Sequence, residues 1–300
     1  MVVVAGVCAT HSPALIMDYK GYRDMARIVS TVGPGGLEEL KKEVDPKIHD
    51  VELEECGRMF ASFKQKLDET RPDVLLVAAN DQFVNFFLNL IPQFCIYVGE
   101  QQEAFIGNPP KPGGKVYKFP SNPELARYIL KESVENGIDL AFSEKLYLQH
   151  TQTVNLYYLN PDQKCSVIQL YVNCGVPPTP TPARCYEFGR ILNKILSKRS
   201  ERVAILGTGG LSHYSAGGYV KGMEEKVHAV DEEGDREILK HIEEGTTTEL
   251  AKHSFEFYQK SGNVEMLNWL IVLGALEGHK GESEYFVRSM GLGGAFIKGD

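Results

Sequence analysis

Apolar runs alternate with segments of helical periodicity along the first two thirds of the chain. Six runs rich in β-branched and other apolar residues predict strands: Val2–Cys8, Val74–Ala79, Phe94–Val98, Asp139–Phe142, Ser166–Val172 and Val203–Leu206. Three segments with helical spacing predict helices: Val51–Thr70, Pro123–Glu135 and Ala183–Ser197. Asn122 is placed to cap the second helix, with Pro123 at its first position. Because unbroken apolar strands need cover on both faces, we expect an α/β fold with a mostly parallel or mixed central sheet flanked by helices.

After Leu206 the pattern becomes helical. Val227–Glu244, Thr246–Lys260 and Asn263–Leu276 predict helices, and we expect no further strand, so the C-terminal third should be helical. Two segments rich in glycine and proline, residues 107–115 and 175–185, predict ordered loops near a site, because regular elements follow them at once. We expect a single domain over residues 1–300.

Composition narrows the class of protein. With 300 residues, 43% of them hydrophobic, the chain can bury a full core. A net charge of −8 argues against a nucleic-acid groove, which needs clustered Lys and Arg. The six cysteines form no C-x-x-C pair, which favours reduced thiols. Without a secretory pattern or an apolar run of the roughly 18 residues that a membrane helix needs, we expect a cytoplasmic protein without membrane contact.

Candidate chemistry repeats at four places where we expect a strand to end. His11 lies in "CATHSPAL", Asp81 and Gln82 in "VAANDQF", His150 in "LYLQHTQTV" and His213 in "LGTGGLSH". Ligands of open α/β sheets gather at the carboxyl ends of strands, so these side chains predict a site there. The alternatives are ordinary: a lone histidine at a strand end is more often structural, and "GTGG" lacks the spacing of a phosphate-binding loop. "GLSH" also lacks the G-x-S-x-G pattern of a serine hydrolase.

A carboxylate for this site is available near the start of the last predicted helix. Glu265 precedes the apolar residues of "VEMLNWLIVLGAL", with Asn263 as a plausible cap. An acidic residue in a first helical turn is commonly only a partner of the helix dipole. An acidic side chain at the start of a buried helix must nevertheless pair with a cation or be protonated. From the residues alone, metal ligation and simple capping remain equally good interpretations.

Together these motifs carry a resemblance to a known family. "THSPAL", the Asp-containing strand end followed by "FFLNLIPQFCIYVG", "QHTQTV", "GTGGLSH" and "VEMLNWLI" occur in the order found in the class III extradiol ring-cleaving dioxygenases. The chain resembles the protocatechuate 4,5-dioxygenase β subunit and 2,3-dihydroxyphenylpropionate 1,2-dioxygenase over nearly its whole length. Residues 19–50 match least.

The resemblance implies a role for each candidate residue. His11 and Glu265 match two of the three ligands of a facial triad on Fe(II), with Mn(II) as a second candidate metal. His150 and His213 match histidines with acid–base roles beside the metal. Asp81, Phe83 and Tyr214 are expected to contact the substrate.

One position departs from the family pattern. The second histidine ligand should follow the Asp of the second motif, and this chain has Gln82 there. Three outcomes remain open: the Gln82 amide oxygen ligates a weaker site, Asp81 replaces it as a ligand, or metal binding is lost. Fe(II) suits two imidazoles and a carboxylate because three coordination positions stay open for substrate and O₂.

The predicted function is therefore extradiol cleavage of a catechol or 2-aminophenol by O₂ at a non-haem iron. The alternative is a catalytically silent subunit or binding protein that has lost a metal ligand. We expect a small aromatic substrate and O₂ as partners and a homo-oligomer, with a separate small subunit left open.

Overall fold

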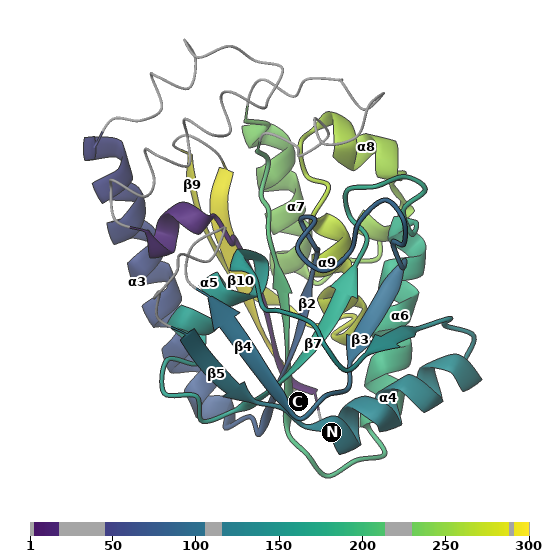
Figure 1. Cartoon of the computed structure of the whole chain (residues 1–300). Helices are drawn as coiled ribbons and strands as arrows, with labels where there is room; N and C mark the ends of the chain where they lie inside the picture. Colours follow the sequence, from purple (N-terminus) through teal and green to yellow (C-terminus); the bar gives the residue numbers. More distant parts are fainter. Residues whose placement is uncertain (1–2, 18–45, 106–115, 214–229, 288–290, 300) are drawn as a thin grey trace.

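A computed structural model describes residues 3–17, 46–105, 116–213, 230–287 and 291–299. Its centre is an eight-stranded mixed sheet in the order β6-β3-β7-β2-β8-β1-β10-β9, with a separate β4–β5 hairpin (Figure 1). The strands are β1 (Val3–Ala9), β2 (Val74–Ala79), β3 (Phe94–Tyr97), β4 (Gln101–Phe105), β5 (Val116–Pro120), β6 (Ala141–Ser143), β7 (Ser166–Val172), β8 (Val203–Thr208), β9 (Gly281–Val287) and β10 (Gly291–Lys298).

Helices cover both faces of the sheet. They are α3 (Pro46–Thr70), α4 (Pro123–Glu135), α5 (His150–Leu159), α6 (Pro182–Leu196), α7 (Glu232–Glu244), α8 (Phe255–Lys260) and α9 (Met266–Ala275), with short 3₁₀ helices η1 (Pro13–Ile16) and η3 (Leu250–Lys252). Alternate residues of β2 enter two cores: Leu75 and Val77 pack with α3 and α5, whereas Leu76 and Ala78 pack with α4, α6 and α9. Because both faces of the central strands are buried, their sequences are continuous apolar runs.

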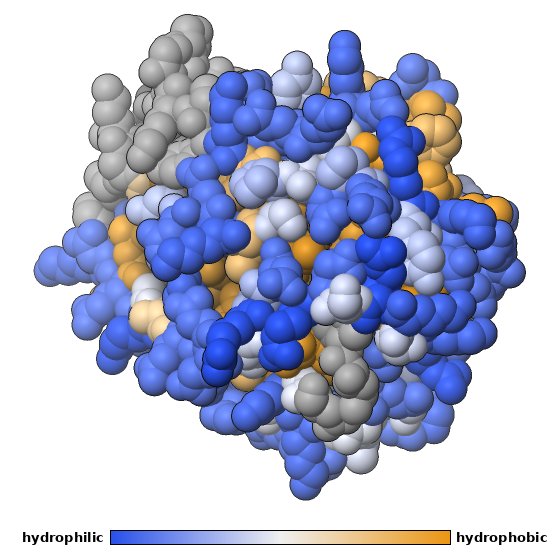
Figure 2. Space-filling model, turned by 90° about the horizontal axis from the view of Figure 1, so that it is seen from below, coloured by the Kyte–Doolittle hydropathy of each residue, from blue (hydrophilic) through white to orange (hydrophobic). Residues whose placement is uncertain are grey.

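Four adjacent strands position the site. Strands β7, β2, β8 and β1 run parallel to one another, so their carboxyl ends meet at one edge of the sheet. That edge therefore receives the residues that directly follow Ala9, Ala79, Val172 and Thr208. Figure 2 looks at the opposite end of the molecule, where hydrophilic residues cover most of the face and hydrophobic ones show between them.

The α/β prediction is confirmed, and most predicted elements lie where expected. Strands β2 and β7 and helix α4 have the predicted bounds. The Asn122 side chain caps α4 by accepting from the Leu125 N–H at 3.0 Å, with Pro123 in the first turn. All six cysteines are free thiols. No described helix is long and apolar enough to cross a membrane.

Three expectations are wrong. The C-terminal third contains helices but also two strands, β9 and β10, which extend the sheet beyond β1 as an antiparallel hairpin. Their sequences, "GESEYFV" and "GLGGAFIK", are rich in glycine and charge, so they lack the apolar run of a central strand. The predicted helix Thr246–Lys260 is broken into η3 and α8. His150 does not follow a strand but begins α5, after an isolated bridge at Leu148.

Candidate active site

His11 and Glu265 form the centre of the site. His11 follows β1 and is buried, and its Nε2 lies 3.0 Å from Oε1 of Glu265. The other ring nitrogen, Nδ1, lies 3.1 Å from the Thr208 hydroxyl at the end of β8. Because a carboxylate only accepts hydrogen bonds, Nε2 carries the proton in this contact, and the Thr208 hydroxyl fixes the ring through Nδ1.

The Glu265 carboxylate is buried at the N-cap position of α9 and is held from several sides. Asn80 Nδ2 donates to Oε1 and the Gly210 N–H donates to Oε2, each at 3.0 Å. Burial opposes the charged form, but the attraction and hydrogen bond of His11, the nearby His213 and the Gly210 N–H outweigh it, and the pKa of Glu265 lies well below its usual range. The structure therefore holds the Glu265 side chain as a buried carboxylate anion.

Gly209 lets Glu265 come this close to the end of β8. Its φ of 103° lies in the region that favours glycine, and a Cβ there would lie 2.3 Å from Oε2 of Glu265. In "GTGGLSH", Gly209 therefore leaves room for the Glu265 carboxylate, and Gly210 supplies an N–H donor to it. These two roles explain the glycine-rich sequence, and no phosphate-binding role is needed.

His213 lies on the other side of the carboxylate, in a defined tautomer. Its Nδ1 is 2.7 Å from the Leu211 carbonyl oxygen, and its Nε2 is 3.7 Å from Oε2 of Glu265. Because a carbonyl only accepts hydrogen bonds, Nδ1 carries a proton, so in the neutral ring the lone pair is on Nε2. The ring is only half-buried, so Nε2 can meet a small molecule at the edge of the sheet.

His150 approaches the same centre from α5. Its ring packs edge-on against His11 with centroids 5.6 Å apart, and its Nδ1 is buried without a hydrogen-bond partner among the described residues. Burial and the neighbouring His11 lower the pKa of His150 to about 3, against the opposing effect of Glu265. His150 is therefore a neutral imidazole at neutral pH.

Asp81 fixes the loop after β2 and ties it to α5. Its carboxylate accepts from the N–H groups of Val84, Asn85 and Phe86 and from the Asn85 side chain. The Gln149 amide also donates to it at 2.7 Å, one residue before His150. Both oxygens are thus occupied, so the carboxylate serves the loop and is not directed at Glu265.

The Gln82 side chain makes no hydrogen bond with another described residue, and its backbone N–H donates to Gln149. Phe83 follows with a φ of 56°, an unusual backbone conformation for an aromatic residue. The structure therefore brings together His11, Glu265, His213 and His150. Gln82 and Phe83 lie on the loop after β2. Tyr214 lies outside the described residues, as do the loop 107–115 and the start of the helix predicted from Val227.

The donor set fits one divalent metal ion. The 3.0 Å between His11 Nε2 and Glu265 Oε1 is the spacing of two ligands that sit at right angles, each about 2.1 Å from one ion. The buried Asn80 Oδ1, on the amide that contacts Glu265, has no hydrogen-bond partner in the described chain. Within that same part, no three His, Cys, Asp or Glu residues are arranged to hold a metal. Among the described residues, a third protein ligand would therefore be a neutral amide oxygen from Asn80 or Gln82.

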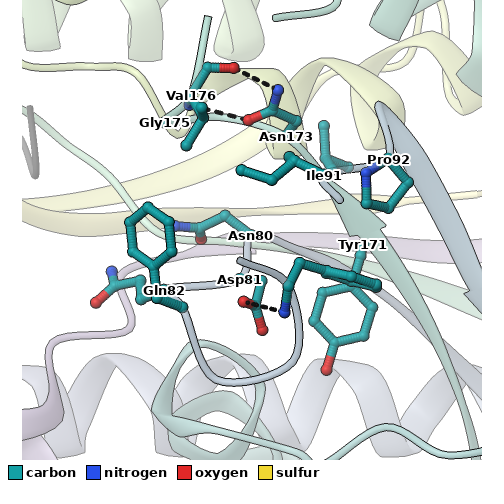
Figure 3. Close-up of a pocket in the computed structure, with 12 residues that line it drawn as sticks. Asn80, Asp81, Gln82, Ile91, Pro92, Tyr171, Asn173, Gly175 and Val176 are labelled. Atoms are coloured by element: carbon teal, nitrogen blue, oxygen red, sulfur yellow. Dashed lines mark hydrogen bonds between the residues drawn. The ribbon is translucent and has the colours of Figure 1, made fainter. Parts of the chain in front are cut away.

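A cavity opens beside this centre, between the ends of β2 and β7 (Figure 3). Its lining encloses about 580 Å³ of empty space, which includes space open to solvent. Asn80, Asp81 and Gln82 line one side, and Gly175 and Val176 of the proline-rich loop line the other. The predicted loop at 175–185 thus borders a cavity, and its glycine and proline content was the signal for it.

Sequence reasoning missed two polar residues of the site. Asn80 contacts Glu265 and lines the cavity, and Gln149 joins the Asp81 loop to α5. Asn80 opens the Asn-Asp-Gln strand end, where the Asp81 carboxylate is the more conspicuous candidate by residue type. Gln149 lies one residue before His150, and its position at a helix N-cap could have been recognised only if α5 had been predicted.

The fold and the site define a class of protein: a mixed α/β domain with a candidate mononuclear metal centre at the carboxyl edge of its sheet. Comparison with known families narrows the class. The family described as "Catalytic LigB subunit of aromatic ring-opening dioxygenase" matches residues 6–295, and the chain belongs to this family. The resemblance to the class III extradiol dioxygenases is confirmed.

Curated relatives carry the name 2,3-dihydroxyphenylpropionate/2,3-dihydroxicinnamic acid 1,2-dioxygenase. The protein of Photorhabdus laumondii is 32% identical over 159 residues, which are 52% of this chain and 48% of the relative. A second one from Pseudomonas putida is 31% identical over 163 residues, 54% of this chain and 50% of the relative. The chain thus spans about half the length of these relatives.

A solved structure shares the fold. The crystal structure of an uncharacterised protein from Escherichia coli K12 aligns with a TM-score of 0.50 and 16% sequence identity, covering 79% of this chain and 91% of that one. At this identity the likeness supports the fold alone.

Proposed function

We propose that the protein is an extradiol dioxygenase that opens the ring of a catechol or 2-aminophenol and incorporates both atoms of O₂. The observation that carries this proposal is the convergence of His11, His213 and His150 on the buried Glu265 carboxylate. Family membership and the names of the curated relatives support the same reaction class. Because both oxygen atoms enter the product, the reaction needs no external reductant.

His11 and Glu265 would hold the metal, with Gln82 as the family's third position and Fe(II) or Mn(II) as the ion. The bound metal would supply a template that brings the substrate oxygens and O₂ together. Thr208 orients His11, and Asn80 and Gly210 orient Glu265, so the two ligands are preorganised. The weaker amide donor predicts weaker metal retention than two imidazoles would give.

His213 would act as the general base. Its Nδ1–H is committed to the Leu211 carbonyl, so Nε2 accepts the proton of a substrate hydroxyl. The resulting imidazolium would lie 3.7 Å from the Glu265 carboxylate. His213 would then keep this proton until it is transferred to an oxygen atom of the product.

His150 would serve a different step. As a neutral ring with a depressed pKa, it binds a proton weakly and gives one up readily. A neutral imidazole N–H beside the reaction centre can donate to oxygen atoms on which negative charge develops. The buried setting, which keeps the ring neutral, also excludes water from that contact.

The test is metal analysis and O₂ uptake with the anaerobically purified and reconstituted protein. We expect about one Fe(II) per chain and O₂ consumption with a panel of catechols and 2-aminophenols, with yellow ring-opened products. A protein that takes up neither iron nor manganese stoichiometrically would overturn the proposal and favour the silent-subunit alternative.

A further inference from the structure

We propose that the cavity beside the metal centre selects catechols whose ring substituent is uncharged over those whose substituent is a carboxylate. This inference rests on the proposed ring-cleaving function and names its substrate class. The cavity shares Asn80 and Gln82 with the strand end at the metal centre and runs from there toward Val176. A ring held by its two oxygens at the centre would therefore extend its substituent into this space.

The walls of the cavity suit an apolar group. Half of the described lining consists of side chains without polar atoms: Phe83, Phe86, Ile91, Pro92, Val172 and Val176. The polar side chains Asn80, Gln82 and Asn173 are neutral amides. Asn173 is occupied by the proline-rich loop, because its side chain donates to the Val176 carbonyl oxygen at 2.6 Å and accepts from the Val176 N–H at 3.0 Å.

The charge of the walls is unfavourable for an anion. Among the described residues that line the cavity there is no Lys, Arg or His, and the ionisable ones are Asp81 and Tyr171. Burial raises the pKa of Tyr171 well above its ordinary value, and the nearby Asp81 raises it further, so the phenol stays neutral. A carboxylate entering here would lose water, meet no cation among the described lining residues and face a charge of its own sign.

The negative charge is also fixed in place. Asp81 is held by backbone N–H groups of the loop after β2 and by Gln149, so its carboxylate cannot turn away without breaking that loop. The substrates in the names of the curated relatives are carboxylic acids. The cavity thus predicts a preference that differs from those names.

The test compares 2,3-dihydroxyphenylpropionate with its methyl ester, which has the same ring and chain length but no charge. Dissociation constants are measured anaerobically with the metal-loaded protein, and kcat/KM is measured with O₂. We expect the ester to bind about tenfold more tightly, or better, and to have the higher kcat/KM. Equal binding, or tighter binding of the acid, would overturn the inference.

A matched pair of variants tests the cause. Val176→Lys adds a cation to the cavity wall, and Val176→Met adds a chain of similar length without charge. Both keep the backbone hydrogen bonds to Asn173. We expect Val176→Lys to shift the acid-to-ester binding ratio about tenfold toward the acid, and Val176→Met to leave it unchanged. An acid-to-ester binding ratio that stays the same in Val176→Lys would contradict the electrostatic cause.

Failure of the two proposals can be told apart. If the metal-loaded wild type binds the ester more tightly but cleaves neither compound, the dioxygenase function fails and the selectivity of the cavity stands. If both compounds are cleaved and the acid is preferred, the function stands and the selectivity inference fails.

Discussion

At the scale of single residues, the site separates groups that hold a metal from groups that move protons. His11 and Glu265 face each other at ligand spacing, whereas His213 touches the carboxylate only at 3.7 Å and has its other nitrogen committed to a backbone carbonyl. A ligand must reach the metal directly, but a base only needs to reach a hydroxyl of the substrate. Replacing a metal ligand should therefore affect metal binding, whereas replacing the base should affect the rate of ring cleavage.

The first prediction exploits this difference. His213→Phe should keep its metal and lose most ring cleavage, because a positioned acid–base group typically contributes about 10²–10⁴-fold. Glu265→Ala should lose the metal itself. Metal content by elemental analysis and O₂ uptake, measured on the same preparations, check both results. Loss of metal in His213→Phe, with retention in Glu265→Ala, would mean that the roles are exchanged.

A second prediction concerns Gln82. The backbone N–H bond to Gln149 does not depend on the side chain, so Gln82→His should keep the loop and restore an imidazole at the family position. Because imidazole is the stronger donor, the dissociation constant for Fe(II) or Mn(II) should fall by about tenfold or more. Gln82→Ala is the control and should not tighten binding. Unchanged affinity in Gln82→His would mean that residue 82 does not face the metal, which would leave the Asn80 amide as the third donor.

These residues also show what a sequence can reveal about a site. Histidines and acids at the ends of apolar runs stand out by type and place, and the order of the motifs indicated the family. Asn80 and Gln149 act through neutral amides whose partners lie 185 and 68 residues away, at Glu265 and Asp81. No local pattern marks such contacts, because they exist only after strand ends and helix starts have been brought together.

At the scale of elements, helix α9 positions Glu265, which lies at its N-cap. The helix is buried throughout and packs closely against α6. Two glycines allow this approach: a Cβ on Gly189 would lie 2.1 Å from the Ile271 carbonyl oxygen, and one on Gly274 would lie 2.0 Å from the Tyr186 carbonyl oxygen. Because both obstacles are backbone atoms, neither can move without shifting a helix.

The third prediction follows from this packing. Gly274→Ala and Gly189→Ala should each lower the free energy of unfolding by about 1–3 kcal/mol or more, despite the higher helix propensity of alanine. Gly57→Ala is the matched control, since a Cβ in the middle of α3 meets nothing within 4 Å. It should stabilise the protein by about 0.5–1 kcal/mol. Urea denaturation measures all three, and a stable Gly274→Ala would show that the two helices do not pack this closely.

At the scale of the whole molecule, the parts that were predicted from the sequence are those whose burial is uniform. Strands β2 and β7 and helix α4 depend on unbroken apolar runs or on clear caps, and their bounds were predicted correctly. The β9–β10 hairpin was not predicted, because β10 pairs with β1, some 290 residues away in sequence, and β9 is only partly buried. Its stability comes from tertiary contacts that a local pattern cannot contain.

A buried carboxylate, Asp235 of α7, links that hairpin to the site through side-chain hydrogen bonds. The Ser212 N–H and the Asn263 side chain donate to its Oδ1, each at 3.0 Å. The hydroxyls of Ser212 and Tyr285 donate to its Oδ2, each at 2.7 Å. Ser212 precedes His213, Asn263 stands two residues before Glu265, and Tyr285 belongs to β9. One side chain thus connects the base, the metal-binding carboxylate and the edge of the sheet.

The last prediction is that Asp235→Asn damages both stability and metal binding. An asparagine amide would place an NH₂ group against donors that now meet a carboxylate oxygen, and hydrogen bonds to a charged group contribute about 1.5–3 kcal/mol each. We expect the free energy of unfolding to fall by about 3 kcal/mol and, at temperatures where the variant stays folded, metal affinity to fall as well.

Glu232→Gln, on the same helix but paired with Arg236 at the surface, is the control and should change neither the free energy of unfolding nor the metal affinity. Tyr285→Phe, which removes one donor and keeps the ring, should lose less stability than Asp235→Asn. Thermal denaturation and metal titration measure these effects. An Asp235→Asn protein with lower stability but unchanged metal affinity would show that the carboxylate supports the fold without positioning the site.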